Sequence, residues 1–321
     1  MLEQKLPDTL SEFGVTGDDI TIRRTDPAID GVNTVFIVAI PDKSSLTLMN
    51  LRITVHVEDI GGKVFRGLED AGGRTLTMKV GTGKTPTDLI VLRKKHGLKV
   101  RTAKMAIIVD DLGIKSLDYA RRLCALEQTV TLSILPFQNR TSDVVQLASE
   151  TGTPYMLHMP MEPTTSAVDP GKGAITTRDL ESDIFAKLDH AFESVRGAHG
   201  LNNHMGSKVT ENIRTMEIIV QYLKDNEYFF IDSRTSQDSR GYELSRKNGV
   251  KSEKLTRYID IEDDRALIAR RLDELADTAL EEGLVIAICH DRPFTVEVLE
   301  KKLPELERRG IRFVEIADVV H

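Results

Sequence analysis

Residues 105–113 read MAIIVDDLG, an apolar run followed at once by two aspartates and a turn-forming stretch. A short continuous apolar run is typical of a strand buried on both faces, as in a parallel sheet covered by helices. Similar runs recur to the end of the chain, and helical periods with polar faces separate most of them. The runs lie at 105–109, 130–135, 154–158, 228–231, 257–261, 284–289 and 311–316, and the helical periods at 116–127, 140–151, 177–195, 210–226, 264–281 and 295–309.

This alternation predicts an α/β fold with a parallel sheet. Seven or eight strand–helix units in roughly 215 residues suit a distorted (β/α)7-8 barrel better than a doubly wound sheet. Nucleotide-binding variants of such folds lose their usual support, because no GxGxxG follows the first strand and no GxxxxGK[ST] occurs. We therefore expect residues 101–321 to form a barrel.

The first hundred residues have a different pattern and predict a small α+β domain, residues 1–100. Strand-like and helix-like segments alternate with Gly, Asp and Pro. No cluster of catalytic residue types occurs among them, so the role of this domain is left open. The expected strands are 20–25, 34–40, 63–68, 74–80 and 88–94, and the expected helices are an amphipathic start at 2–13 and a segment at 44–59.

Composition separates the same two parts of the chain. The 321 residues carry 43 Lys and Arg against 50 Asp and Glu, a net charge of -7. Residues 1–104 hold 16 basic and 13 acidic residues (+3), which leaves 27 and 37 for the remainder (-10). The acidic total argues against a nucleic-acid partner. Six of the twelve residues at 93–104 are basic, and we interpret them as a solvated linker in preference to a contact with an anionic polymer.

Cysteine content and hydropathy add three expectations. Cys124 and Cys289 make neither a disulfide framework nor a zinc ribbon, and we expect buried, inert thiols. No run approaches the ~20 apolar residues that span a bilayer. The first residues, MLEQKLPDTLSEFG, contain no apolar core of a signal peptide, so none is expected in this chain.

Polar residues lie at the ends of five expected strands: four are runs given above, and the fifth is a further strand in the segment AHGLNNHMGS, residues 198–207. In parallel α/β folds the carboxyl ends of the strands form the ligand site, so these residues are expected to meet. Each has a structural alternative: Asp110 or Asp111 could cap a helix, although Ser116 is better placed, and a lone histidine is more often a core residue. The residues in question are Asp110 and Asp111; His158; Asn202, Asn203 and His204; Asp232 and Arg234; and His290 and Arg292.

Together these residue types predict metal-assisted hydrolysis. Asp111, His158 and His204 would hold a divalent metal, most simply zinc, which takes oxygen and nitrogen ligands and keeps a position open for water. Two adjacent carboxylates at an apolar strand end also favour a bound cation. Asp110 would then act as the general base and His290 as the general acid on the leaving group of an amide or ester.

Six blocks carry a resemblance to the divergent polysaccharide deacetylase family: MAIIVDDLG, TLSILPF, MLHMPMEP, GLNNHMGS, FFIDSRTS and AICHDRP. The resemblance covers residues 105–320. It implies a distorted barrel, a divalent metal at its top, and the roles given above for Asp110, Asp111, His158, His204 and His290.

The resemblance also implies outer or substrate contacts. Asp232 and Arg234 would take that part, and we expect the same of Asn202, Asn203 and Arg292. Better-studied deacetylases carry two ligand histidines four residues apart, whereas His158 and His204 lie 46 apart, so Glu162 is an alternative ligand.

Three functions are weighed. The first is a metal-dependent hydrolase that removes acyl groups from a carbohydrate. The second is a non-catalytic carbohydrate-binding or cell-envelope scaffold protein. The chain has no Trp, so the nearest candidates for stacking on a sugar ring are Tyr155, Tyr228, Phe137 and Phe294. The third, a metal phosphoesterase, would need a second metal site, and only Asp232 and Asp291 are spare. The family implies an extracytoplasmic location; the oligomeric state is not predicted.

Overall fold

The computed structural model describes residues 6–7, 10, 15, 17–29, 31–42, 44–96, 98 and 103–321. Contacts divide the chain into two compact units. One holds the described residues up to Ala103 together with Glu305–Ile311, and the other holds Lys104–Pro304 together with Arg312–His321. The two predicted domains, with their boundary at residue 100, stay a prediction.

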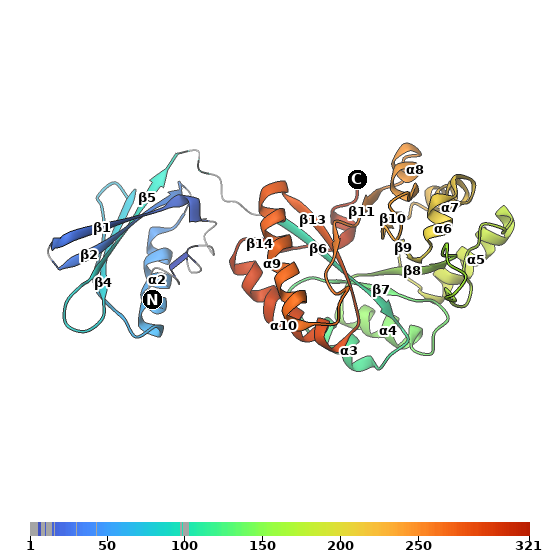
Figure 1. Cartoon of the computed structure of the whole chain (residues 1–321), viewed down its shortest axis with the longest axis horizontal. Coiled ribbons are helices and arrows are strands. Elements are labelled where there is room, and N and C mark those ends of the chain that lie inside the picture. Colours follow the sequence, from blue (N-terminus) through green and yellow to red (C-terminus); the bar gives the residue numbers. More distant parts are fainter. Residues whose placement is uncertain are drawn as a thin grey trace. The chain divides into compact units, whose positions relative to one another are not determined.

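The first unit is a five-stranded sheet with one long helix (Figure 1). The strand order is β1-β2-β5-β4-β3, and β2 and β5 run parallel while the other neighbours are antiparallel. Its elements are a 3-10 turn (Gly17–Asp19), β1 (Ile20–Ile29), β2 (Val32–Pro41), α2 (Leu46–Asp59), β3 (Lys63–Glu69), β4 (Thr75–Gly81) and β5 (Asp88–Lys95).

Hydrophobic spacing explains these elements. Leu46, Met49, Ile53 and Val57 follow one another at three or four residues along α2, so they share one buried face. Residues of β4 alternate between buried and half-buried positions, as expected for a strand that packs on one face. The five predicted strands and the helix at 44–59 are confirmed. Of the helix expected at 2–13, most residues lie outside the part that the structure describes.

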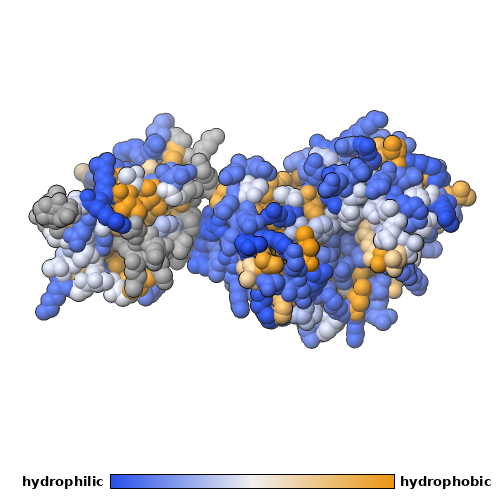
Figure 2. All heavy atoms as spheres, viewed as in Figure 1, coloured by the Kyte–Doolittle hydropathy of each residue, from blue (hydrophilic) through white to orange (hydrophobic). Residues whose placement is uncertain are grey.

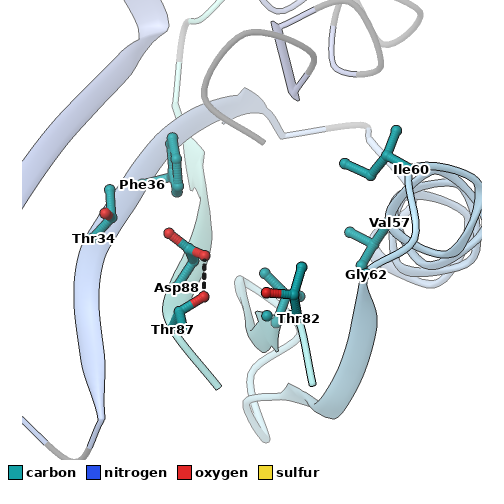
Figure 3. A pocket seen from close by; sticks show the side chains of 10 residues that line it. Thr34, Phe36, Val57, Ile60, Gly62, Thr82, Thr87 and Asp88 are labelled. Carbon is teal, nitrogen blue, oxygen red and sulfur yellow. Dashed lines mark hydrogen bonds between the residues drawn. The ribbon is translucent and has the colours of Figure 1, made fainter. Parts of the chain in front are cut away.

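A cavity of about 350 Å³ opens beside the end of α2 in this unit (Figure 3). Phe36, Val57 and Val80 give it an apolar floor, and Thr34 and Asp88 contribute to its polar part. The basic stretch at 93–104 lies only partly in the described residues: its first three residues end β5, Ala103 begins the next strand, and residues 97 and 99–102 are not described.

The second unit consists of strands that alternate with helices, and its elements are given whole although Ala103 and Glu305–Ile311 are grouped with the first unit. The strands are β6 (Ala103–Leu112), β7 (Thr131–Ile134), β8 (Tyr155–Met161), β9 (Gly200–Met205), β10 (Phe229–Asp232), β11 (Ser252–Lys254), β12 (Arg257–Tyr258), β13 (Leu284–His290) and β14 (Ile311–Phe313). The helices are α3 (Leu117–Cys124), α4 (Thr141–Thr151), α5 (Glu181–Ser194), α6 (Ser207–Glu211), α7 (Ile213–Asp225), α8 (Gly241–Lys247), α9 (Arg265–Glu282) and α10 (Pro293–Arg308), with a final 3-10 turn (Ile316–Asp318).

The sheet of this unit is parallel and curls strongly. Its order is β11-β10-β9-β8-β7-β6-β13-β12, with β14 paired to β6 outside this path. The strands at the two ends, β11 and β12, belong to one segment, residues 252–258. Its Leu255 N–H donates to Asp232 O, and the next N–H, of Thr256, donates to Ile286 O on the opposite side of the curl. The predicted distorted barrel is therefore confirmed.

Alternate residues of the strands face the inside of this curl. Ile108 of β6, Met156 of β8, Ile231 of β10 and Ile288 of β13 belong to one buried cluster although they come from four strands. Their neighbours in sequence, such as Phe230, point to the helices instead: a Cβ atom on Gly241 of α8 would lie 2.6 Å from the Phe230 ring. This alternation decides which strand-end residues can share a site.

Three details differ from the sequence prediction. The helix expected at 210–226 is two helices, because the Asn212 side chain accepts a hydrogen bond from Thr215 N–H and starts α7 anew. Helix α8 and strand β11 were not predicted. Cys289 is buried as expected, whereas Cys124 is only half-buried.

The visible face of the molecule is largely hydrophilic, with hydrophobic atoms in separate patches (Figure 2). Among the described residues, every helix is too short or too polar to cross a lipid bilayer.

Candidate metal centre

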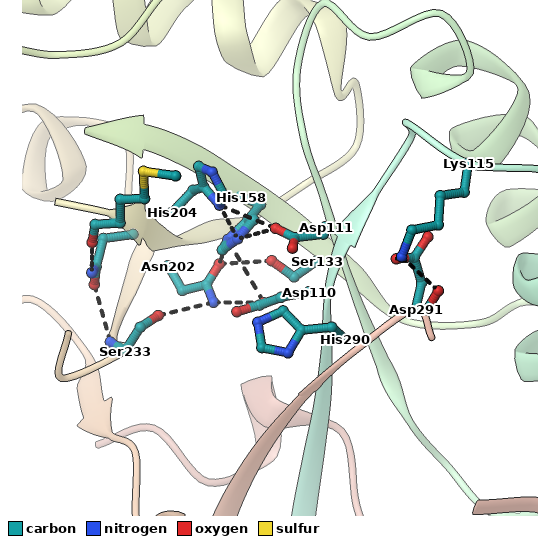
Figure 4. A network of polar contacts seen from close by, with 12 residues as sticks. Asp110, Asp111, Lys115, Ser133, His158, Asn202, His204, Ser233, His290 and Asp291 are labelled. Atoms are coloured by element: carbon teal, nitrogen blue, oxygen red, sulfur yellow. Dashed lines mark hydrogen bonds and ion pairs between the residues drawn. The ribbon is translucent and has the colours of Figure 1, made fainter. Parts of the chain in front are cut away.

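The first pair of polar residues lies at a distortion of β6. Successive strand residues normally point to opposite faces, so Asp110 and Asp111 should diverge. However, the pairing of β6 with β7 shifts register between Val109 and Leu112, and Asp111 has a φ of 67°. Such a bulge redirects a side chain. Asp110 continues the inward-facing series of Ile108, and Asp111 turns to the same side (Figure 4).

The two histidines come together through strand register. In the parallel pair β8 and β9, His158 lies opposite Asn202, and Pro160 lies opposite His204. His204 is two residues beyond Asn202 and therefore on the same face. A separation of 46 residues in sequence becomes a neighbouring position in space.

Asp111, His158 and His204 form a compact group. One ligand atom from each lies within 4.8 Å of the others. Asp111 Oδ1 is 3.1 Å from His204 Nδ1 and 3.3 Å from His158 Nε2, and these two nitrogens are 3.0 Å apart. Asp111 Oδ1 is nevertheless a buried oxygen that no described residue satisfies with a well-formed hydrogen bond. A buried anionic oxygen without a donor is costly, which is the condition that a cation relieves.

Asn202 fixes the orientation of His158. Its Nδ2 donates to Asp110 Oδ1 (2.9 Å) and to Ser233 Oγ (3.1 Å). Because a carboxylate can only accept, the amide must face this way, and Asn202 Oδ1 then accepts from Ser133 Oγ and His158 Nδ1. The proton of neutral His158 is therefore on Nδ1, and the lone pair of Nε2 points into the group. Metal-binding histidines are usually oriented in this way.

The donor set fits a divalent metal. One carboxylate and two imidazoles suit zinc, and three protein ligands leave a position for water or substrate. Burial opposes ionisation of Asp111, but the close approach of His158 and His204 outweighs it and holds the pKa of this carboxyl well below its usual range. The carboxylate is thus ionised wherever a metal ion would compete for it.

His290 lies at the end of β13, the strand next to the one that carries Asp110 and Asp111. In the register of β13 and β6, His290 is opposite Asp110. Its Nδ1 is 2.9 Å from Asp260 Oδ1, and its backbone N–H donates to Asp260 Oδ2. Burial lowers the pKa of His290, but the hydrogen bond and charge of Asp260 outweigh burial and raise it. The ring also stacks at 6.2 Å on Tyr258.

The group is closed below and open above. The side chains of Asp110 and His158 are each 3% exposed, whereas those of Asp111 and His204 are 30% and 19% exposed. His290 is 22% exposed. A molecule in solution can therefore reach Asp111, His204 and His290, while His158 and the expected base, Asp110, are buried beneath them.

Several predicted site residues lie elsewhere. Asp232 follows Phe230 toward the helices: its oxygens accept from Arg234 N–H, Ser239 Oγ and Tyr242 N–H. Arg234 has a φ of 51° and donates to Gln237 O. These contacts shape the loop after β10, and the structure does not bring Asp232 or Arg234 into the group.

The remaining predicted residues also have structural partners. Glu162 accepts from Lys208 Nζ (2.6 Å) and from Thr177, so both its oxygens are used outside the ligand group. Asn203 bridges Met205 O, Thr235 Oγ1 and Ser233 N–H. Arg292 donates to the backbone oxygen of Asp260, the residue whose side chain binds His290.

Sequence reasoning missed three residues of this region, Asp260, Ser133 and Lys115, and it named Asp291 only as a spare carboxylate. Asp260 follows a strand, the same signal used for the other residues, but the apolar residues on both sides of it extended the predicted strand to 261. Lys115 Nζ lies 2.7 Å from Asp291 Oδ1. Burial raises the pKa of Asp291 to about 6, although Lys115 opposes this.

The match to a known protein family covers nearly the whole of the second unit. The profile of a family described as divergent polysaccharide deacetylase matches residues 107–320. An uncharacterised protein of Haemophilus influenzae is 32% identical over 208 residues, 63% of this chain and 73% of that protein. The uncharacterised Escherichia coli protein YibQ is 28% identical over 208 residues, 64% of each chain, so less than two thirds of its length is covered.

A solved structure supports the fold alone. An uncharacterised protein of Agrobacterium tumefaciens C58 superposes with a TM-score of 0.65 at 21% identity, covering 70% of this chain and 92% of that one.

Proposed function

Because this chain belongs to the divergent polysaccharide deacetylase family, we propose that it is a metal-dependent hydrolase that removes acyl groups, acetyl above all, from a carbohydrate polymer or oligomer. Asp111, His158 and His204 would hold the metal, most simply zinc. When bound there, a divalent metal polarises an acyl carbonyl and acidifies water. The observation that carries the proposal is the buried Asp111 Oδ1, which faces two imidazole nitrogens and has no well-formed hydrogen bond.

Asp110 is placed to take a proton. It lies at the closed floor of the group, and the hydrogen bond from Asn202 Nδ2 to Oδ1 fixes its carboxylate. A general base must stay ionised and be held within reach of the proton that it accepts. The same amide orients His158, so Asn202 couples the position of the base to that of an expected ligand.

His290 is placed to give a proton to the leaving group. Asp260 holds the Nδ1 side of the ring, so Nε2 is the nitrogen that can exchange a proton with a substrate. The raised pKa keeps a larger share of His290 protonated at neutral pH, as a general acid requires. Asp110 and His290 come from neighbouring strands, β6 and β13, and could act on the same acyl bond.

A carbohydrate-binding or scaffold function without turnover is the second candidate. The sequence has no Trp and only 5% aromatic residues, so it offers few side chains that could stack on a sugar ring. This function would need no pair of proton-transfer groups, so a test of turnover separates the two.

The test compares the wild type with Asp110→Asn on N-acetylglucosamine oligomers and aryl acetates. We expect the wild type, supplied with zinc, to release acetate. The variant should keep its metal but release acetate about 10²–10⁴-fold more slowly, because an amide cannot take the proton. Acetate release by colorimetry and metal content by elemental analysis give the two readings. A wild type that binds metal and sugar without turnover on either substrate would support the scaffold function instead.

A further inference from the structure

A hollow lined by cationic side chains lies between the segments that follow β6 and β7. It measures about 560 Å³, and its lining includes Lys115, Arg121 and Arg140 together with Ser116 and Asn139. We propose that this hollow binds an anionic substituent, a carboxylate or a phosphate, on the carbohydrate chain. The proposal rests on the proposed function and specifies its substrate: an acidic glycan in place of a neutral one.

The hollow is close to the expected chemistry. Its first wall, residues 114–117, begins three positions after Asp111 in the loop between β6 and α3. Lys115 Nζ contacts both Asp291 Oδ1 (2.7 Å) and Asp291 O (3.0 Å), and Asp291 directly follows His290. Figure 4 shows this pair beside Asp111 and His290. A sugar whose acyl group lies at the metal group can therefore extend a neighbouring unit toward the hollow.

The described residues that line the hollow include three cations and no carboxylate. Each cation has a carboxylate partner just outside the lining: Asp291 for Lys115, Asp118 for Arg121 and Asp143 for Arg140. Two of the three cations are arginines, whose planar fork matches carboxylate and phosphate oxygens. An anion would therefore be recognised by these guanidinium groups and not by an excess of positive charge.

The two arginines are available to a ligand. Arg121 pairs with Asp118 at 3.2 Å and Arg140 with Asp143 at 2.9 Å, each within its own turn. All four side chains are well exposed, and exposed pairs of this kind contribute little stability. A bound anion can share or take over these guanidinium groups at low cost.

The walls of the hollow are held together before any ligand binds. Arg140 N–H donates to Gly113 O, and Leu135 N–H donates to Leu112 O, so the loops after β6 and β7 are joined at two points. Gly113 adopts a φ of 110°, where a Cβ atom would lie 3.3 Å from Leu135 O. A preformed site loses less entropy on binding than a mobile one.

The test measures binding, not turnover, with three labelled tetramers of N-acetylglucosamine: neutral, with a carboxylate at C6, and with a phosphate at C6. By fluorescence anisotropy at an ionic strength of about 0.01 M, we expect the wild type to bind at least one charged tetramer about tenfold more tightly than the neutral one. At about 1 M salt the preference should disappear. A preference for the carboxylate or for the phosphate identifies the substituent.

Arg121→Gln combined with Arg140→Gln should abolish the preference and leave affinity for the neutral tetramer unchanged. The matched control is Arg270→Gln, an exposed arginine on α9 that also pairs within its helix, and it should behave as the wild type. Equal binding of all three tetramers by the wild type, or a preference that survives the double substitution, overturns the proposal. Acetate release is followed on the same samples: a charge preference without release contradicts the hydrolase, and release without a preference contradicts the anion-binding hollow.

Discussion

Asp111 and Asp232 occupy similar places, each at the carboxyl end of a buried strand, and the fold gives them opposite environments. Asp232 receives hydrogen bonds from Arg234, Ser239 and Tyr242 and holds its own loop together. Asp111 has a buried oxygen without a well-formed hydrogen bond, and two histidine nitrogens face it. One carboxylate contributes to stability, and the other can bind a ligand.

The difference comes from the direction of each side chain. Asp232 follows the alternation of β10 and points with Phe230 toward α8, on the outside of the curl. Asp111 should also point outward, since Asp110 points inward, but the bulge and positive φ of Asp111 reverse it. A strand-end carboxylate is therefore not enough to mark a site; its position in the alternation, or a break in it, decides.

The largest expected effect is on metal binding at Asp111. We expect Asp111→Asn to weaken zinc binding by about 100-fold or more, because structural zinc gains about 10–16 kcal/mol from some four ligands together. Asparagine tolerates positive φ, so the backbone is kept and the charge is removed. Competition with a chelating dye measures the affinity. Wild-type affinity in this variant would remove Asp111 from the ligand set.

Asn202 tests whether the orientation of His158 matters. Asn202→Ala removes the acceptor that holds His158 Nδ1, and loss of such outer partners costs about 10–100-fold in metal affinity. The matched control is Asn203→Ala, the adjacent residue whose amide faces Met205 and Thr235 instead. If both substitutions weaken zinc binding equally, the effect is one of loop stability and not of histidine orientation.

Asp232 should behave in the opposite sense to Asp111. Asp232→Asn turns an acceptor oxygen into a donor amide facing Ser239 and Tyr242, or Arg234, and should lower the free energy of unfolding by about 1–3 kcal/mol. Zinc affinity should stay unchanged. Denaturant unfolding and zinc titration of both variants check the contrast, and a loss of zinc affinity in Asp232→Asn as large as that in Asp111→Asn would contradict it.

The smallest effect concerns pH and the pair of Asp260 and His290. The pKa of His290 is raised, so its contribution to stability is fully present below its ordinary value of 6.5 and is lost as pH rises through the raised value. The pKa of Asp260 is lowered, so its contribution is lost as pH falls below its ordinary 3.8. In metal-free protein, the stability difference between wild type and Asp260→Asn should be larger at pH 6 than at pH 9. His290→Gln should remove this pH dependence; a difference that stays flat contradicts the coupling.

The sequence predicts the barrel well because the same strand-and-helix pattern recurs many times along residues 105–321. Each buried strand is an apolar run and each outer helix has a polar face, so one mistaken element changes little. The strand ends also give the correct neighbourhood for Asp110, His158 and His290. The structure differs at α8 and β11, which are short and therefore leave a weak pattern.

Direction of the side chains could not be predicted. Strands of a covered parallel sheet are apolar on both faces, so the residue types do not reveal which alternate set points inward. For that reason Asp232 and Asp111 were both expected at the site. Asp260 was not expected there, because Ile259 and Ile261 extended the predicted strand past it. The bulge at Asp111 depends on how β6 pairs with β7, a contact that no local pattern encodes.

The segment at residues 252–258 has a consequence for solubility and assembly. It lies between β10 and β13 and pairs first with one and then with the other, and Ser252 N–H additionally donates to His321 O. Seven residues thus cover both edges of a sheet whose exposed strands would otherwise be templates for a second chain. Loss of this short segment, by proteolysis or deletion, would leave the unpaired backbone groups of β10 and β13 exposed at once, and both strands could then pair with another chain.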